Sequence, residues 1–297
     1  GIPRPANLLF LYLLGFYLLL LSVKVDYRLS AVGAIAFAFS SYFFIIIMAG
    51  HMTKAHAIAY VPMVVAAVLY TYRGRIFLGG VLTALAVALE LYANHLQITY
   101  YLVLVLILIG IVQFVKDLKA NNISSFAKRS GVLVLAALLA SGTAVTRLST
   151  TMEYGKESTR GKSELTNDLD NKTSGLDKDY ATSWSYGIAE TFTLLIPNFY
   201  GGASQGELTT DSETYQAIKR APNAKQLIKQ LPLYWGTQPF TSGPTYAGSI
   251  VMFLFIFGLL FVKSEMRVWI LLATIMSIML AWGKNFMPLT DLFLDYF

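Results

Sequence analysis

Eight long apolar runs limit how this chain can fold more than any other feature of its sequence. They lie at about residues 6–23, 31–50, 57–72, 76–93, 97–115, 131–146, 247–263 and 268–282. Each approaches the ~20 residues that an α-helix needs to cross a bilayer. The runs are continuously apolar rather than alternating, which excludes a transmembrane β-barrel. Charged residues make up only 13% of the chain, about half of what a soluble domain carries. The sequence therefore predicts an all-α polytopic membrane protein with about eight transmembrane helices.

The basic residues between these runs predict the orientation in the membrane. One alternate set of connections holds ten Lys and Arg residues against three Asp and Glu residues, a net charge of +7. The other set contains the turns near 51–56 and 94–97 and the long segment 147–246. The long segment alone has a net charge of −1. Cytoplasmic loops carry the excess of Lys and Arg, so residues 147–246 are predicted to be extracytoplasmic. Because the basic residues are spread over several loops instead of one soluble face, no nucleic-acid partner is expected.

The chain divides into three parts on this basis. These are residues 1–146 with about six transmembrane helices, the extracytoplasmic loop or cap 147–246, and residues 247–297 with about two transmembrane helices and the start of a further outer segment. Within the cap, residues 147–182 are polar and predict a solvated loop. Residues 183–202 are aromatic and amphipathic, which is typical of the membrane interface. Residues 212–231 predict a short polar helix broken at Pro222.

Polar residues at the outer ends of the apolar runs are the candidates for a ligand pocket, because polar groups are costly inside a bilayer. They are His51, Lys54, His56, Glu90, Asn94, His95, Gln97 and Lys284. If the helix continues past Glu90, Asn94 lies one turn further along the same face, and Gln97 follows Asn94 at a spacing of three. The alternative is that the lysines reach to lipid headgroups and the histidines are only interfacial.

Cofactor chemistry receives little support from the sequence. The chain has no cysteine and three histidines, which excludes disulfides and thiolate metal sites. It contains no P-loop and no G-x-G-x-x-G after a strand. We identify no cofactor and no metal-ligand set, and the need for a divalent metal is left open.

Five blocks in order give the chain a family resemblance. They are FSSYFFIIIMAGHMTKAHAIAYVPMVVAAVLYTYRG, LTALAVALELYANHLQITYYL, YGIAETFTLLIPNFYGG, YWGTQPFTSGPTYAGSIVMF and AWGKNFMPLTDLFLDYF. The chain resembles the YfhO family of bacterial membrane proteins, in the form found in Bacteroidetes. The resemblance implies a longer GT-C-like glycosyltransferase of the bacterial cytoplasmic (inner) membrane, which uses polyprenyl-phosphate sugars on the extracytoplasmic side. It also implies an acidic catalytic residue in a loop before Gly1. The chain is thus expected to be an internal piece, and no catalytic residue is assigned to it.

This resemblance suggests ligand roles for the candidate residues. The cationic and imidazole groups of His51, Lys54, His56 and Lys284 would contact the donor phosphate, and Tyr234 and Trp235 would cover the sugar. Membrane lipid would surround the polyprenyl tail. Two alternatives from other classes use the same features. One is a transporter or flippase for a lipid-linked sugar, and the other is a non-catalytic subunit of a cell-envelope assembly.

Overall fold

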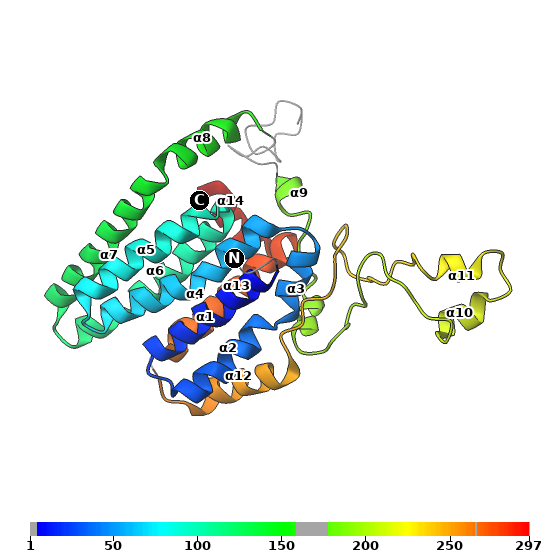
Figure 1. Cartoon of the computed structure of the whole chain (residues 1–297), viewed down its shortest axis with the longest axis horizontal. Helices are drawn as coiled ribbons and strands as arrows, with labels where there is room; N and C mark the ends of the chain where they lie inside the picture. The colour runs from blue at the N-terminus through cyan, green and yellow to red at the C-terminus, as the bar shows by residue number, and fades with distance from the viewer. Residues whose placement is uncertain (1–4, 159–177, 265, 297) are drawn as a thin grey trace. The chain divides into compact units, whose positions relative to one another are not determined.

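The computed structural model describes residues 5–158, 178–264 and 266–296, and helices are the only extended regular elements in those ranges (Figure 1). The chain divides into two compact units. The first unit contains Gly1–Glu157 and Phe257–Ile275, and the second contains Ser158–Ile256 and Met276–Phe297. The prediction of an all-α chain is confirmed for the described residues.

The first unit is a series of helices joined by short turns. They are α1 (Ala6–Ser22), α2 (Tyr27–Ala38), α3 (Ser41–Met48), α4 (Met52–Tyr72), α5 (Ile76–Tyr92), α6 (Leu96–Lys119), α7 (Ile123–Thr143) and α8 (Val145–Lys156). Lys24, Gly50, Gly74, Asn94 and Asn121 follow the ends of helices and have positive φ angles. A left-handed residue at this position ends a helix by turning the chain away from the axis, and Gly and Asn adopt it most readily.

Close packing of α1, α3 and α4 forms one part of the core of this unit. The ring of Tyr12 is fully buried and stacks on Phe43, with 4.1 Å between the ring centres. Its hydroxyl donates a hydrogen bond of 2.8 Å to the carbonyl oxygen of Ala55. A Cβ atom added at Gly15 would lie 3.0 Å from the carbonyl oxygen of Ala59. Small residues therefore bring α1 and α4 together, as is common between membrane helices.

Four helical segments are long and apolar enough to cross a membrane. They are Met52–Tyr72, Leu96–Lys119, Ile123–Thr143 and Met266–Asp295. The α2–α3 pair, bent by 41°, would make a fifth if it counts as one span. Each of the eight predicted runs carries a helix or this bent pair, but α1, α5 and α12 (Ser249–Phe261) have fewer than 18 residues. A helix of 13 residues extends only about 20 Å. These findings indicate a membrane protein and fall short of the predicted eight spans.

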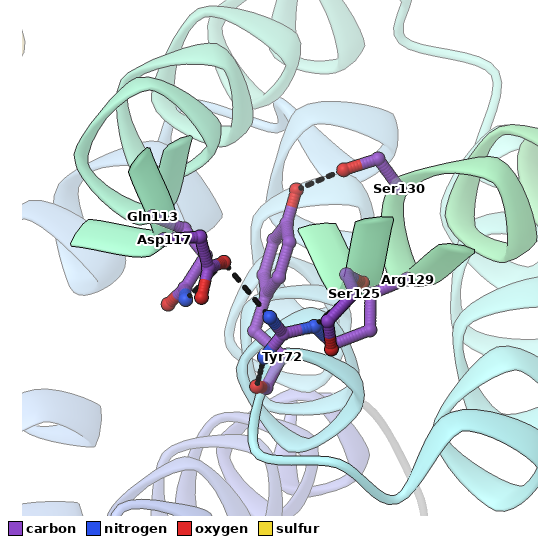
Figure 2. Close-up of polar contacts among 6 residues, drawn as sticks. All are labelled: Tyr72, Gln113, Asp117, Ser125, Arg129 and Ser130. Atoms are coloured by element: carbon purple, nitrogen blue, oxygen red, sulfur yellow. Dashed lines mark hydrogen bonds and ion pairs between the residues drawn. The ribbon is translucent and has the colours of Figure 1, made fainter. Parts of the chain in front are cut away.

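A buried ion pair joins α6 and α7, and a hydrogen bond connects it to the last residue of α4 (Figure 2). A guanidinium nitrogen of Arg129 lies 2.8 Å from Oδ2 of Asp117. The same guanidinium donates to the carbonyl oxygens of Tyr72 at 2.6 Å and Ser125 at 3.0 Å. The Tyr72 hydroxyl lies 3.1 Å from Oγ of Ser130. The ion pair and the bonds to Tyr72 thus hold the three helices together.

The second unit consists of short helices and irregular chain. Its elements are α9 (Lys178–Ala181), the 3₁₀ helix η2 (Ala189–Leu194), α10 (Glu213–Ile218), α11 (Ala224–Leu227), the 3₁₀ helix η3 (Gly283–Phe286) and α14 (Met287–Tyr296). The residues of α12 and α13 (Met266–Trp282) divide between the two units. The predicted helix broken at Pro222 is confirmed, because α10 and α11 lie on either side of it. The predicted solvated loop from residue 147 is wrong at its start, where α8 continues to Lys156; residues 159–177 of that loop lie outside the described ranges.

Two isolated bridges, Gly201 with Tyr234 and Gly206 with Leu231, hold the irregular chain of this unit together. Gly201 has a φ of 82°, and a Cβ atom added there would lie 1.9 Å from the carbonyl oxygen of Leu233. Only glycine fits this close approach of two backbone segments.

Candidate functional site

A polar cavity of about 580 Å³ lies within the second unit. Its walls come from three separate parts of the chain: α9 with the turn after it, the segment at 237–239, and η3 with α14. The lining residues are Lys178, Asp179, Thr182, Ser183, Thr237, Pro239, Lys284, Met287 and Asp291. Two lysines, two aspartates and three hydroxyl-bearing residues therefore line one space, a combination suited to a ligand that carries both charge and hydroxyl groups.

One of the two lysines is held by carboxylates. Asp291 and Asp295 are four residues apart on α14, so they lie on the same face of that helix. Their carboxylates lie 2.9 and 3.2 Å from Nζ of Lys178. The hydrogen bonds with Asp291 and Asp295 raise the pKa of Lys178, so its ammonium group stays charged at neutral pH. The side chains of the two aspartates are 41% and 46% exposed, and such pairs contribute at most about 1 kcal/mol to stability.

The other lysine, Lys284, is positioned through its backbone. Its N–H donates to Oγ of Ser185 at 2.9 Å, and the side-chain amide of Asn285 donates to the carbonyl oxygen of Tyr186 at 2.7 Å. Gly283, with a φ of 45°, lies so close to Ser185 that an added Cβ atom would be 2.0 Å from its Oγ. Within the part of the chain that the structure describes, the Lys284 ammonium group forms no ion pair. Its positive charge is therefore available to an anionic ligand.

A buried carboxylate behind the cavity wall was missed by the sequence reasoning. Glu190 is 4% exposed and accepts three hydrogen bonds. The donors are the Tyr234 hydroxyl at 2.8 Å, the Gln238 side-chain amide at 3.2 Å and the Gly187 N–H at 3.2 Å. Burial, and to a lesser extent the bond to Glu190, raises the pKa of Tyr234. Glu190 thereby fixes the segment that contains Thr237 and Pro239. It is the only charged residue within 183–202, and that isolation was the signal available in the sequence.

The two predicted aromatic residues have different environments. The Tyr234 hydroxyl donates a hydrogen bond to Glu190, so Tyr234 stabilises its own loop. The neighbouring Trp235 is 78% exposed and is not among the residues that line the cavity. The role of either ring as a cover for a sugar stays a prediction.

The residues predicted near the start of α4 lie in the first unit. His51 precedes α4, and His56 is hydrogen-bonded through Nδ1 to the carbonyl oxygen of Met52 at 2.8 Å. The Lys54 ammonium nitrogen lies 5.4 Å from the centre of the Tyr42 ring. A cation over an aromatic face at this distance is attracted by the ring. Lys54 therefore has a partner within its own unit.

The turn between α5 and α6 differs from the predicted geometry. Glu90 is fully buried and accepts a hydrogen bond from the Thr99 hydroxyl, 3.0 Å from both carboxylate oxygens. The expected stacking of Asn94 on Glu90 along one helix is wrong, because α5 ends at Tyr92 and Asn94 has a φ of 57°. Gln97 belongs to the next helix, α6, where its amide donates to the Tyr101 hydroxyl at 3.0 Å.

His95 lies between Asn94 and Gln97, immediately before α6. Its carbonyl oxygen accepts from the N–H groups of Ile98 and Thr99, the first hydrogen bonds of that helix. The predicted pocket residues are thus divided between the units, with Lys284 in the second unit and the three histidines, Lys54 and Glu90 in the first. A single pocket that contains both sets stays a prediction.

The chemistry of the described cavity is that of binding through charge and hydroxyl groups. Among the described residues, no three His, Asp or Glu side chains meet in a metal-binding arrangement. The Thr182 and Ser183 hydroxyls donate to the carbonyl oxygens of Lys178 and Asp179 at 2.8 and 2.7 Å, so toward a ligand they can act as acceptors. Lys284 is the donor with a full positive charge that lines the cavity without an ion pair in the described ranges. Comparison of the chain with protein-family models, with curated proteins and with solved structures finds no match.

Proposed function

We propose that this chain is part of a GT-C-like glycosyltransferase of the YfhO type in the bacterial cytoplasmic membrane, with about eight crossings and an extracytoplasmic cap. It would transfer a sugar from a polyprenyl-phosphate donor to a cell-envelope acceptor. The observation that carries the proposal is the polar cavity that contains Lys284, directly after the apolar helix α13. A lipid-linked phosphate needs a cation at this junction between apolar helix and polar chain.

The ion-pair pattern around the cavity supports an anionic ligand. Lys178 is balanced by Asp291 and Asp295, whereas Lys284 has no ion-pair partner among the described residues. Hydrogen bonds from a charged donor to phosphate are roughly twice as strong as neutral ones. Lys284 is therefore the residue proposed to contact the donor phosphate.

The hydroxyl-bearing residues of the cavity support a sugar as the ligand. Thr182, Ser183 and Thr237 line the same space as Asp179, and carboxylates and hydroxyls are suitable partners for sugar hydroxyls. Trp235 follows Tyr234 and is exposed. An exposed aromatic ring on a neighbouring segment would supply an apolar face for the ring of a sugar, as predicted from the sequence.

The test is sugar transfer from a radiolabelled polyprenyl-phosphate sugar by the protein in membranes. Lys284→Ala should reduce donor use by about tenfold, which corresponds to the loss of one charge-assisted contact. Lys284→Arg keeps the charge and should retain most of the activity. Lys229→Ala is the matched control, because Lys229 is an exposed lysine of the same unit that does not line the cavity.

Two results would reject parts of this proposal. Equal rates for Lys284→Ala and Lys229→Ala would remove Lys284 from the donor site. If the wild-type protein uses no polyprenyl-phosphate sugar across a panel of donors, the glycosyltransferase proposal is wrong, and a non-catalytic subunit of an envelope assembly is the better interpretation.

The bend between α2 and α3 favours a second candidate, a transporter or flippase for a lipid-linked sugar. The two helices differ in direction by 41° across a break at Phe39 and Ser40. Broken helices in membrane transporters expose backbone groups to a substrate. Movement of a fluorescent lipid-linked sugar across reconstituted vesicles, without its hydrolysis or transfer, would favour this candidate over the transferase.

A further inference from the structure

A second cationic site lies in the first unit, where the end of α5 meets the junction of α7 and α8. The guanidinium carbon of Arg147 lies 4.6 Å from the centre of the Tyr92 ring. One guanidinium nitrogen also donates to the carbonyl oxygen of Tyr92. No carboxylate pairs with Arg147 in the described ranges. The side chain is therefore held in place at one edge, while its charge is not neutralised.

Arg147 lines a cavity of about 480 Å³. Its other lining residues are Ala88, Tyr92, Thr143, Ala144, Thr146 and Thr150. The hydroxyls of Thr143 and Thr150 donate to backbone carbonyl oxygens at 2.7 and 3.0 Å. Thr146 is exposed and can direct its hydroxyl to a ligand. Arginine has five N–H donors in a planar fork that matches phosphate oxygens, and the bond to Tyr92 uses only one of them.

An apolar groove of about 470 Å³ lies along the same helix. It is formed by α1, α4 and α5, and its α5 residues run from Leu78 to Leu89. Eleven residue steps along a helix span about 16 Å, close to half of the ~30 Å hydrocarbon core of a bilayer. Leu85, one of the groove residues, is 57% exposed, and the groove residue Leu89 lies three positions before Tyr92 of the cavity at Arg147. Helix α5 therefore has a cationic polar site at its end and an apolar surface one leaflet long beside it.

We propose that Arg147 and Thr146 bind the phosphate of a membrane phospholipid whose acyl chains lie along α5. The proposal concerns the first unit only and does not depend on the glycosyltransferase proposal. A membrane lipid is favoured over a soluble phosphate because the cation lies at the end of an exposed apolar helix face. A soluble anion would gain nothing from the groove between Leu78 and Leu89.

Native mass spectrometry of the whole chain in detergent, titrated with palmitoyl-oleoyl phosphatidylglycerol, tests this proposal. Arg147→Gln should weaken lipid binding about tenfold, which corresponds to the loss of a charge-assisted contact. Arg147→Lys keeps the charge but loses the planar fork, so its lipid affinity should lie between those of the wild type and Arg147→Gln. Arg75→Gln makes the same charge change at the opposite end of α5, and its lipid affinity should remain within about twofold of that of the wild type.

Thr146→Asp provides a variant that leaves the Arg147–Tyr92 contact intact and places a carboxylate in the cavity. It should also weaken lipid binding about tenfold, because a like charge repels the phosphate. If Arg147→Gln and Thr146→Asp both bind phosphatidylglycerol as tightly as Arg75→Gln, the site does not exist. Displacement of the lipid by glycerol phosphate at equal concentration would show that a soluble anion is the ligand and would overturn the lipid assignment.

Discussion

Replacement of Arg129 by Gln should destabilise the first unit strongly. Figure 2 shows the guanidinium group between Asp117 and the Tyr72 carbonyl oxygen. The side chains of Arg129 and Asp117 are only 10% and 6% exposed. Without Arg129, the Asp117 carboxylate would stay buried, with the Gln113 amide at 2.8 Å as its remaining donor in the cluster.

The size of this effect follows from the burial of the pair. Removal of one partner of a buried ion pair costs about 3–5 kcal/mol, because the other charge is left uncompensated. The Arg129 bonds to Tyr72 and Ser125 are lost as well. The pair of Lys178 and Asp291 has almost the same length, 2.9 Å, but the aspartate is 41% exposed. We therefore expect Lys178→Gln to cost less than about 1 kcal/mol.

The measurement is the free energy of unfolding, obtained by titrating SDS into the protein in dodecyl maltoside and following its helical circular dichroism. Arg75→Gln is the control for loss of an exposed arginine and should stay within about 0.5 kcal/mol of the wild type. The double variant Arg129→Met, Asp117→Leu removes both charges and should recover much of the lost stability. If Arg129→Gln unfolds like Arg75→Gln, the burial argument is refuted.

Three further predictions concern the second unit. Gly201→Ala should lower the stability of this unit by at least about 1–3 kcal/mol in a thermal melt, since its Cβ atom would collide with the Leu233 carbonyl oxygen; an unchanged melt would contradict the bridge geometry. Tyr234→Phe should lower the free energy of unfolding by about 1–3 kcal/mol, because Glu190 loses its shortest hydrogen bond of 2.8 Å. A loss below about 0.5 kcal/mol would show that this hydrogen bond does not stabilise the unit. A cysteine at Lys229, in a chain without other cysteines, should react with a membrane-impermeant maleimide in intact cells; labelling only after permeabilisation would reverse the predicted topology.

The positions of the helices could be predicted because they depend on local patterns. Apolar runs and the turn residues between them are read directly from the sequence, and each run carries a helix or the bent pair. Asn94 shows that the ends are predictable as well, since asparagine at positive φ is a common helix terminator. The stacking expected for Glu90 and Asn94 was wrong because α5 ends at Tyr92 and Asn94 has a left-handed conformation.

The candidate site was predictable only in part, because its contacts join residues far apart in the sequence. Lys284 was found from its place at the end of an apolar run. Lys178 meets Asp291 across 113 positions, and Glu190 meets Tyr234 across 44. No local pattern specifies which polar residues of a loop will meet at such separations. By sequence, Arg147 belongs to the long polar segment; it comes next to Tyr92 because α7, which leads into α8, packs against α5.

The contact between Gly283 and Ser185 has a consequence for how this sequence can change during evolution. A Cβ atom at position 283 would collide with the Ser185 hydroxyl, and that hydroxyl also accepts the N–H of Lys284. A side chain at position 283 would displace the backbone that carries the lysine, and loss of the Ser185 hydroxyl would take this acceptor away from the Lys284 N–H. Homologous sequences that keep a lysine at position 284 should therefore keep glycine and serine together, and those that lose the lysine should be released from both constraints at once.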